Sequence, residues 1–188
     1  MNYHRLHRLK AQITQITLFL VVVLYLTGCG YTTRSFITDK YKTIYVAPFE
    51  NAIDITKDTD ASSRYKIYHP LLETDISREV INRFISDGNL SISRKDEADL
   101  ILNGKLVDFR RDALRYTSDE DVEEYRISLK VDLSLTDKDK KLLWEEKGLI
   151  ADTAYFVSGP HAKSESTAID EAVKDLSRRI VERVIESW

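Results

Sequence analysis

Cysteine, histidine, glycine and proline are scarce in this sequence, and each shortage narrows the chemistry that the chain can perform. The single cysteine leaves no internal disulfide to form, and none of the four histidines stands in a metal-ligand spacing such as H-E-x-x-H. The six glycines form neither a G-x-G-x-x-G nor a P-loop pattern, which are the common loops that hold phosphate groups. A G-x-S-x-G nucleophile motif is absent as well. We therefore expect no metal, no cofactor and no catalytic site of these kinds.

The net charge is mildly negative, which bears on the partners of the chain. The whole sequence carries −3 at neutral pH, and residues 1–28 hold three basic residues and no acid, so the remainder carries −6. Domains that bind nucleic acid are usually basic, so we expect no nucleic-acid partner. The 160 residues after position 28 are enough for one domain with its own core.

The amino terminus has the pattern of a secretory signal. Three basic residues, Arg5, Arg8 and Lys10, precede an apolar run at Ile16–Leu26 that is interrupted only by Thr17. A basic start, a short apolar middle and small residues at the end are typical of a cleaved signal peptide. A permanent membrane span needs about 20 apolar residues, so a helical anchor is the weaker interpretation.

Cys29, the only cysteine, follows this run directly. The four residues 26–29, Leu-Thr-Gly-Cys, resemble a bacterial lipobox, in which a peptidase cuts before the cysteine and the cysteine carries acyl chains. The alternatives are a plain signal peptide with a free thiol, or a short uncleaved anchor. Two or more acyl chains anchor a protein stably. Gly30 stands where an aspartate would favour inner-membrane retention, so the resemblance implies the periplasmic side of the outer membrane. We assign residues 1–28 to the signal peptide and 29–42 to a lipidated tether.

The first half of residues 43–188 predicts a strand, a helix and a short strand. Residues 43–49 are β-branched and aromatic, and a long loop at 50–69 follows them. Pro70 suits the opening of a helix over 71–87, and Gly88 suits its end. Apolar residues recur every four positions in this helix, at Leu72, Ile76, Val80 and Phe84. A short strand at 89–94 then suggests a crossover onto a sheet.

The second half predicts three long strands and a last helix. Alternation of apolar and polar residues is clearest at 123–136, which indicates a strand with one buried face, and strands at 99–110 and 141–155 flank it. Gly104 indicates a bulge or a close approach of the backbone. Either Ser164 or Thr167 caps the last helix. The predicted fold is α+β, with two helices on one face of a mostly antiparallel, mixed sheet of four to five strands. The other face is partly polar and suits a docking surface.

Seven segments in order resemble the LptE family of outer-membrane lipoproteins that assemble lipopolysaccharide. No single segment is specific, and the resemblance rests on their order and spacing over nearly all of residues 29–188. The segments are GCGY at 28–31, KTIYVAPFEN at 42–51, FISDGNL at 84–90, EADLILNGKLVDFRRDALRY at 97–116, EYRISLKVDLSL at 124–135, LLWEE at 142–146 and AIDEAVKDLSRRIVERVIESW at 168–188.

The resemblance implies a non-catalytic role and two partners. Members of the family fold as two helices on a small sheet, plug the lumen of the LptD β-barrel and are thought to bind lipopolysaccharide. Basic side chains pair with phosphate through charge-assisted hydrogen bonds. Two basic groups near predicted strand ends are therefore candidate phosphate contacts, namely Arg110, Arg111 and Arg115, and Lys138, Lys140 and Lys141. The alternative is that these residues only keep a turn and a strand edge soluble.

Two other functions compete with this assignment. An accessory lipoprotein of an efflux or secretion machine would share the anchor and the fold. An enzyme would need separated carboxylates in a pocket, whereas Asp119, Glu120 and Asp121 lie in one polar run typical of a hairpin loop.

Overall fold

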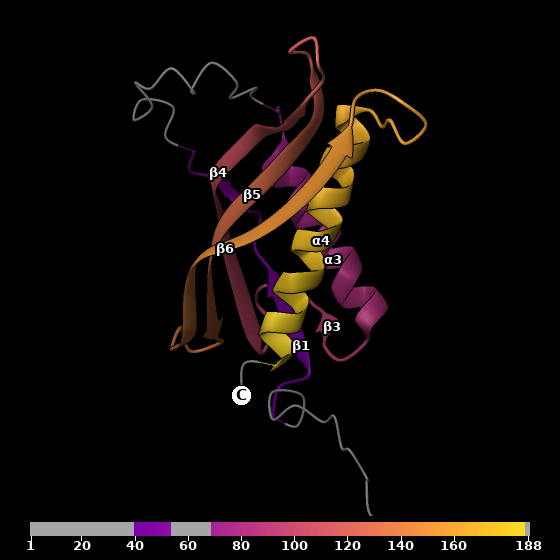
Figure 1. Ribbon diagram of the computed structural model, residues 1–188. Helices are drawn as coiled ribbons and strands as arrows, with labels where there is room; N and C mark the ends of the chain where they lie inside the picture. The colour runs from indigo at the N-terminus through magenta and orange to yellow at the C-terminus, as the bar shows by residue number, and fades with distance from the viewer. Residues whose placement is uncertain (1–39, 54–68, 187–188) are drawn as a thin grey trace, which may run out of the picture. The chain divides into compact units, whose positions relative to one another are not determined.

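The computed structural model describes residues 40–53 and 69–186 (Figure 1). The predicted signal peptide at 1–28, Cys29 and most of the predicted tether lie outside these residues. In chain order the elements are β1 Thr43–Val46, β2 Glu50–Asn51, α3 Leu72–Asp87, β3 Ser91–Ile92, β4 Leu100–Tyr116, β5 Val122–Asp137, β6 Leu142–Phe156 and α4 Glu165–Glu186. The strands form one six-stranded sheet in the order β3-β1-β4-β5-β6, with β2 also paired to β4.

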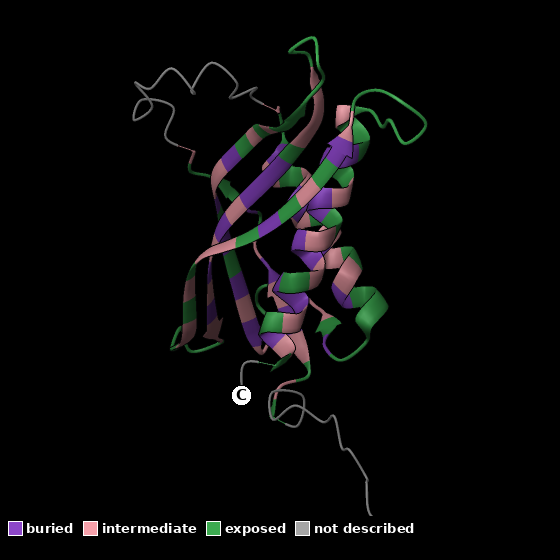
Figure 2. Cartoon of the chain, viewed as in Figure 1, coloured by how far each residue is buried: buried purple, intermediate pink, exposed green. Residues whose placement is uncertain are grey.

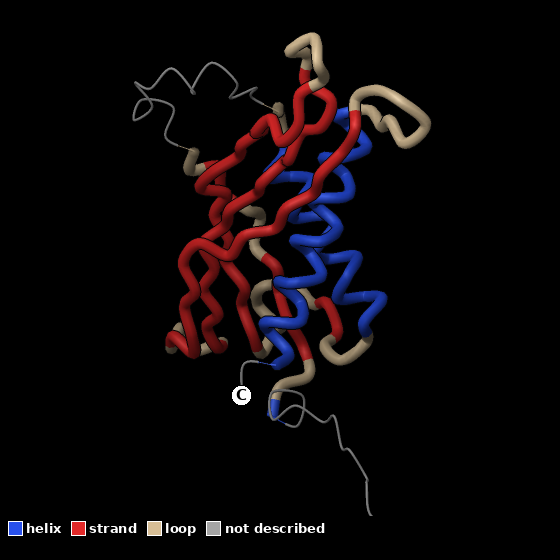
Figure 3. The backbone as a smooth tube through the Cα atoms, viewed as in Figure 1, coloured by secondary structure: helices blue, strands red, loops and turns tan. Residues whose placement is uncertain are grey.

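The helices form a second layer on one face of this sheet, as the sequence predicted. They pack against each other, and α4 lies on β5 and β6 while α3 contacts β1 and β3 (Figure 3). β1 pairs in parallel with β3 and β4, and β4, β5 and β6 form an antiparallel meander. The predicted α+β class and mixed sheet are confirmed. Among the described residues, neither helix is long and apolar enough to cross a bilayer.

The meander is built from the alternating pattern of the sequence. Buried and more exposed positions alternate along its strands (Figure 2). The odd-numbered residues of β5 from Ile127 to Leu135 are fully or almost fully buried beneath the helices. The predicted strand at 99–110 was too short, because β4 continues to Tyr116. Its last three residues, Leu114, Arg115 and Tyr116, are exposed, and the ladder to β5 holds them in the strand up to the Tyr116–Val122 pair.

The helix ends differ slightly from their predictions. Pro70 does not open α3, because Leu71 follows it with a φ of 64° and the helix begins at Leu72. Gly88 ends the helix as expected, with a φ of 77° and an N–H that donates to the Phe84 carbonyl. Of the two candidate caps of α4, Ser164 is the one used, since its hydroxyl accepts the Thr167 N–H at 3.1 Å.

Gly104 marks a close approach rather than a bulge. A Cβ at this position would lie 2.1 Å from the ring of Phe49, which is itself only 4% exposed. Heavy atoms of a stable structure do not approach so closely, so only glycine leaves room for this ring. The bulges of β4 lie further along, the first of them between Leu106 and Asp108.

Candidate functional site: a polar sheet face with two basic ends

The sheet face opposite the helices is polar and balanced in charge. On β5 it carries the even-numbered residues, and their neighbours on β4 have complementary charges. Asp132 lies opposite Lys105, Lys130 opposite Asp108, and Arg126 opposite Asp112. Opposite charges directly across an antiparallel pair stabilise the pairing. The result is a charged surface that is suited to water or to a polar partner.

This surface is tied down by hydrogen bonds as well as by the ladder. The Asp132 carboxylate accepts the Gly148 N–H at 2.7 Å, and the Ser128 hydroxyl bonds to the Asp152 carboxylate. Ser128 is only 7% exposed, although it lies on the face that the helices leave open. The carboxylates of Asp132 and Asp152 are therefore held in place on this face.

The structure places Arg110 and Arg115 together on the polar face. Arg110 lies opposite Ser128 in the ladder and forms an ion pair with Asp108 at 3.0 Å. Arg115 lies opposite Glu124, 3.6 Å from its carboxylate, and its guanidinium stands 5.6 Å from the centre of the Phe156 ring. Both arginine side chains are more than half exposed, so they retain donors for a ligand.

Arg111 is separated from this pair, because it points to the helix-covered face. Its side chain is only 15% exposed, forms an ion pair with Glu165 at the start of α4, and lies 4.8 Å from the centre of the Tyr125 ring. Burial opposes the charge, but the Glu165 carboxylate outweighs it and leaves the pKa of Arg111 raised. Arg111 thus holds α4 on the sheet, and it does not share a surface with Arg110.

Tyr155 stacks on Tyr125, with ring centres 5.9 Å apart, and burial raises the pKa of the Tyr155 phenol. The negative charge of Glu165 raises it further. The phenol therefore remains neutral and contributes packing at physiological pH.

The three lysines lie at the other end of the sheet, in the turn between β5 and β6. The Asp137 carboxylate accepts the N–H groups of Asp139 and Lys141, each at 2.9 Å. Lys140 takes a φ of 62°, which closes the turn. The Asp137 carboxylate is thus engaged by the backbone. The side chains of Lys138, Lys140 and Lys141 are all exposed.

The two basic groups are too far apart to bind one phosphate cluster. The Lys138 N–H donates to the Asp99 carbonyl, next to Leu100 at the start of β4. At about 3.3 Å per residue, the part of β4 from Leu100 to Arg110 spans roughly 30 Å. The groups are therefore two separate candidate sites at opposite ends of the meander.

The polar face holds further cations that the sequence did not single out as binding residues. Lys105, Arg126 and Lys130 lie on the same face as Arg110. The alternation of β5 placed Arg126 and Lys130 on the solvent face. Their grouping with Lys105 and Arg110 depends on the register between the strands, which the sequence does not contain.

The acidic run between β4 and β5 forms an exposed turn. Asp119, Glu120 and Asp121 lie exposed in the turn, where the Thr117 N–H donates to the Asp121 carbonyl at 2.7 Å. Across residues 40–53 and 69–186, no cluster of three potential ligands could hold a metal ion.

The fold is similar to that of two solved bacterial proteins. One is the uncharacterized lipoprotein B from Nitrosomonas europaea, with 13% identity and a TM-score of 0.52 over 77% of this chain and 83% of that one. The other is a protein from Xanthomonas campestris, with 14% identity and a TM-score of 0.53 over 78% of this chain and 87% of that one. At these identities the similarity establishes the fold alone.

The sequence itself carries the stronger relationship. No curated protein matches it significantly. The model of the LptE family, described as lipopolysaccharide-assembly, matches residues 41–184, which include every strand of the sheet and almost all of α4. This protein therefore belongs to the LptE family of lipopolysaccharide-assembly proteins.

Proposed function

We propose that this protein is a non-catalytic lipoprotein that assists lipopolysaccharide assembly at the outer membrane, as the plug or partner of an LptD-like β-barrel. The family match over residues 41–184 is the observation that carries the proposal. Acyl chains on Cys29 would hold the body at the periplasmic side of the membrane. The proposed partners are the barrel and lipopolysaccharide itself.

The geometry of the sheet supports a role inside a wet partner. A plug needs a rigid body and a polar surface, and the three-stranded meander provides both. On its open face, opposite charges face one another across the ladder, Lys105 with Asp132 and Asp112 with Arg126. Contact with another hydrated polar wall costs such a face little free energy, whereas an apolar face would require a dry interface.

We propose that the exposed basic groups contact lipopolysaccharide phosphates. Arg110 and Arg115 form the group on the polar face, and Lys138, Lys140 and Lys141 form the group in the β5–β6 turn. Arginine binds phosphate with two parallel N–H donors, while lysine acts as a point charge. Arg111 contributes indirectly, because its ion pair with Glu165 fixes the part of β4 that carries Arg110 and Arg115.

A pull-down from native membranes in mild detergent tests the partnership. The tagged full-length chain should recover a large outer-membrane β-barrel in a near one-to-one amount, measured by quantitative mass spectrometry. Recovery of an inner-membrane transporter or a secretion channel instead would refute the proposal and favour an accessory role in that machine. A Cys29→Ser variant should leave the membrane fraction if the cysteine carries the anchor.

A matched pair of variants tests whether the polar face makes the contact. Asn103→Arg adds bulk and charge on this face, opposite Ser134, without breaking an ion pair. Ser86→Arg adds the same group at an exposed position of α3. Recovery of the barrel should fall for Asn103→Arg and persist for Ser86→Arg. Equal recovery by both variants would place the contact elsewhere.

A further inference from the structure

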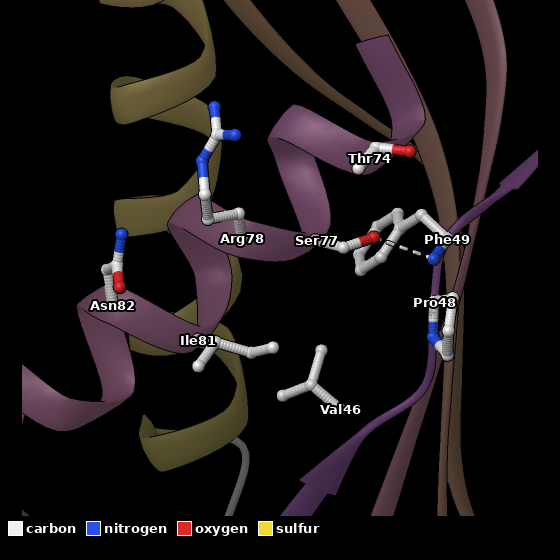
Figure 4. A pocket seen from close by; sticks show the side chains of 8 residues that line it. All are labelled: Val46, Pro48, Phe49, Thr74, Ser77, Arg78, Ile81 and Asn82. Carbon is white, nitrogen blue, oxygen red and sulfur yellow. Dashed lines mark hydrogen bonds between the residues drawn. The ribbon is translucent and has the colours of Figure 1, made fainter. Parts of the chain in front are cut away.

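A pocket of about 330 Å³ opens between α3 and the segment that joins β1 to β2 (Figure 4). It belongs to neither basic group, and it lies beside the parallel strands rather than on the polar face. The residues that line it come from the end of β1, the segment after it and α3: Val46, Pro48, Phe49, Thr74, Ser77, Arg78, Ile81 and Asn82. Its size is at the lower end of the range of about 300–1,000 Å³ for small-molecule sites.

The pocket exists because the chain leaves the ladder between β1 and β2. The Ala47 N–H donates to the Leu102 carbonyl, and pairing resumes at β2, where Glu50 lies beside Lys105. Between these points Pro48 has no N–H to offer. The Phe49 N–H turns instead to the Ser77 hydroxyl on α3, at 2.8 Å (Figure 4). This hydrogen bond ties the segment to α3 at one side of the pocket.

The interior of the pocket is mainly apolar. The Phe49 ring is held over Gly104, where no other residue would leave it room. Val46 is 5% exposed, and its side chain points toward that of Ile81 across the pocket (Figure 4). The Ser77 hydroxyl is already engaged, since it also donates to the Glu73 carbonyl at 2.7 Å. An occupant would thus meet hydrocarbon at the base.

The rim offers hydrogen-bond donors and one cation. Thr74, Arg78 and Asn82 lie on the outer side of α3, one turn apart, and none of the eight lining residues is acidic. Arg78 is 67% exposed, its guanidinium points away from the apolar base of the pocket, and one of its nitrogens forms an ion pair with Asp75 at 2.6 Å (Figure 4). A guanidinium has five N–H donors, so others remain for an anion at the mouth.

We propose that this pocket binds a single-chain anionic lipid, with a fatty acid as the simplest ligand. The hydrocarbon chain would lie against Val46, Phe49 and Ile81, and the carboxylate would face Arg78. The volume is suited to one hydrocarbon chain. The single cation among the hydrogen-bond donors of the rim is suited to one acidic head group. This site goes beyond the proposed role in lipopolysaccharide assembly, because it uses none of the basic residues assigned to that role.

Titration of the purified full-length protein with a fluorescent long-chain fatty acid tests the inference. We expect saturable binding that Ile81→Trp abolishes by filling the pocket. Because Ile81 is partly buried, Asn82→Trp provides a second block from an exposed position that does not endanger the fold. Ile85→Trp, on the exposed side of the same helix at 64% exposure, is the matched control and should bind like the parent.

The contribution of the charge is tested separately. Arg78→Gln should weaken fatty-acid binding by up to about five-fold, since exposed ion pairs contribute modestly. Arg94→Gln, which breaks a comparable exposed pair with Glu97 away from the pocket, should have no effect.

Unaltered binding in Ile81→Trp and Asn82→Trp would overturn the site. Equal affinity for a neutral long-chain alcohol would overturn the anionic head group. Barrel recovery by the same variants reports on the assembly role independently.

Discussion

Arg111 of β4 and Glu165 of α4 form an ion pair that joins the far half of the meander to the first turn of the last helix. The guanidinium also lies over the Tyr125 ring, so the pair is shielded on one side by an aromatic face. Glu165 stands where the helix dipole favours a negative charge. Three interactions with different physical origins therefore meet at one contact between the layers.

Glu165→Gln should destabilise the protein noticeably. The substitution leaves a mostly buried guanidinium without its counter-charge, and removing one partner of such a pair costs about 1–3 kcal/mol. The free energy of unfolding, measured by urea denaturation, should fall by that amount with an unchanged slope. Arg178→Gln is the control, because it breaks more exposed pairs within α4 and should cost less than about 1 kcal/mol. Equal losses for the two variants would contradict a special role for the contact.

Gly104→Ala should be among the most destabilising single-methyl additions in the chain. The new Cβ would lie 2.1 Å from the Phe49 ring, so the ring must move out of its buried position. Overpacking of this kind costs about 1–3 kcal/mol. Thermal unfolding followed by circular dichroism measures the loss. Combining Gly104→Ala with Phe49→Ala should cost less than the sum of the two single losses, whereas strict additivity would show that the two residues do not compete for space.

Stability should fall in acid partly through Asp99. The Lys42 N–H, and then the hydroxyl and N–H of Thr43, hold the pKa of this carboxyl below its usual value. A lowered pKa in the folded state stabilises above the unfolded value of about 3.9, and this stabilisation is lost as the pH falls through the folded value. Asp99→Asn should therefore be less stable than the parent at neutral pH, and the difference should shrink below about pH 4. A difference that stays constant down to pH 2 would contradict this origin.

Loss of the basic groups should weaken binding to lipopolysaccharide. We expect lower affinity for Arg110→Gln with Arg115→Gln, and also for the triple glutamine variant of Lys138, Lys140 and Lys141. Each effect should diminish at high salt, because exposed charges are screened within about 10 Å at 0.1 M ionic strength. Surface plasmon resonance with immobilised lipopolysaccharide measures the affinities.

The control for this experiment lies on the helical layer. Lys174→Gln removes an exposed cation of α4 and should leave the affinity unchanged. Full retention of binding when both basic groups are replaced together would refute their assignment. Loss in only one group would identify the end of the meander that meets the lipid.

The sequence predicted the fold well where one local pattern decides it. Three local patterns each predict their structure from a few residues. They are the alternation of β5, the apolar stripe of α3 and the glycine at position 88. The end of β4 could not be predicted in this way, because residues 111–116 remain in the strand through the ladder to β5. The left-handed backbone conformation of Leu71 could not be predicted either, since leucine does not favour it.

The candidate site was predicted only in part, for a similar reason. Arg110, Arg111 and Arg115 appear as one basic group in the sequence, yet strand alternation sends Arg111 to the opposite face. The bulges of β4 decide which of the following residues share a face, and their positions come from pairing with β5. The pocket beside α3 depends on contacts between segments almost thirty residues apart, as in the Phe49–Ser77 hydrogen bond.

The parallel pairing of β1 also has a consequence for the order of folding. β4, β5 and β6 are joined by tight turns and can assemble from neighbours in sequence, whereas β1 must find Ser91 and Leu100 across the whole of α3. Such non-local contacts carry the larger loop-closure entropy and form late. We expect β1 to enter a sheet that is already largely built. If acyl chains on Cys29 hold the amino terminus, as we propose, the chain can therefore begin to fold while it is anchored, since the meander of β4, β5 and β6 does not require β1, the strand nearest that anchor.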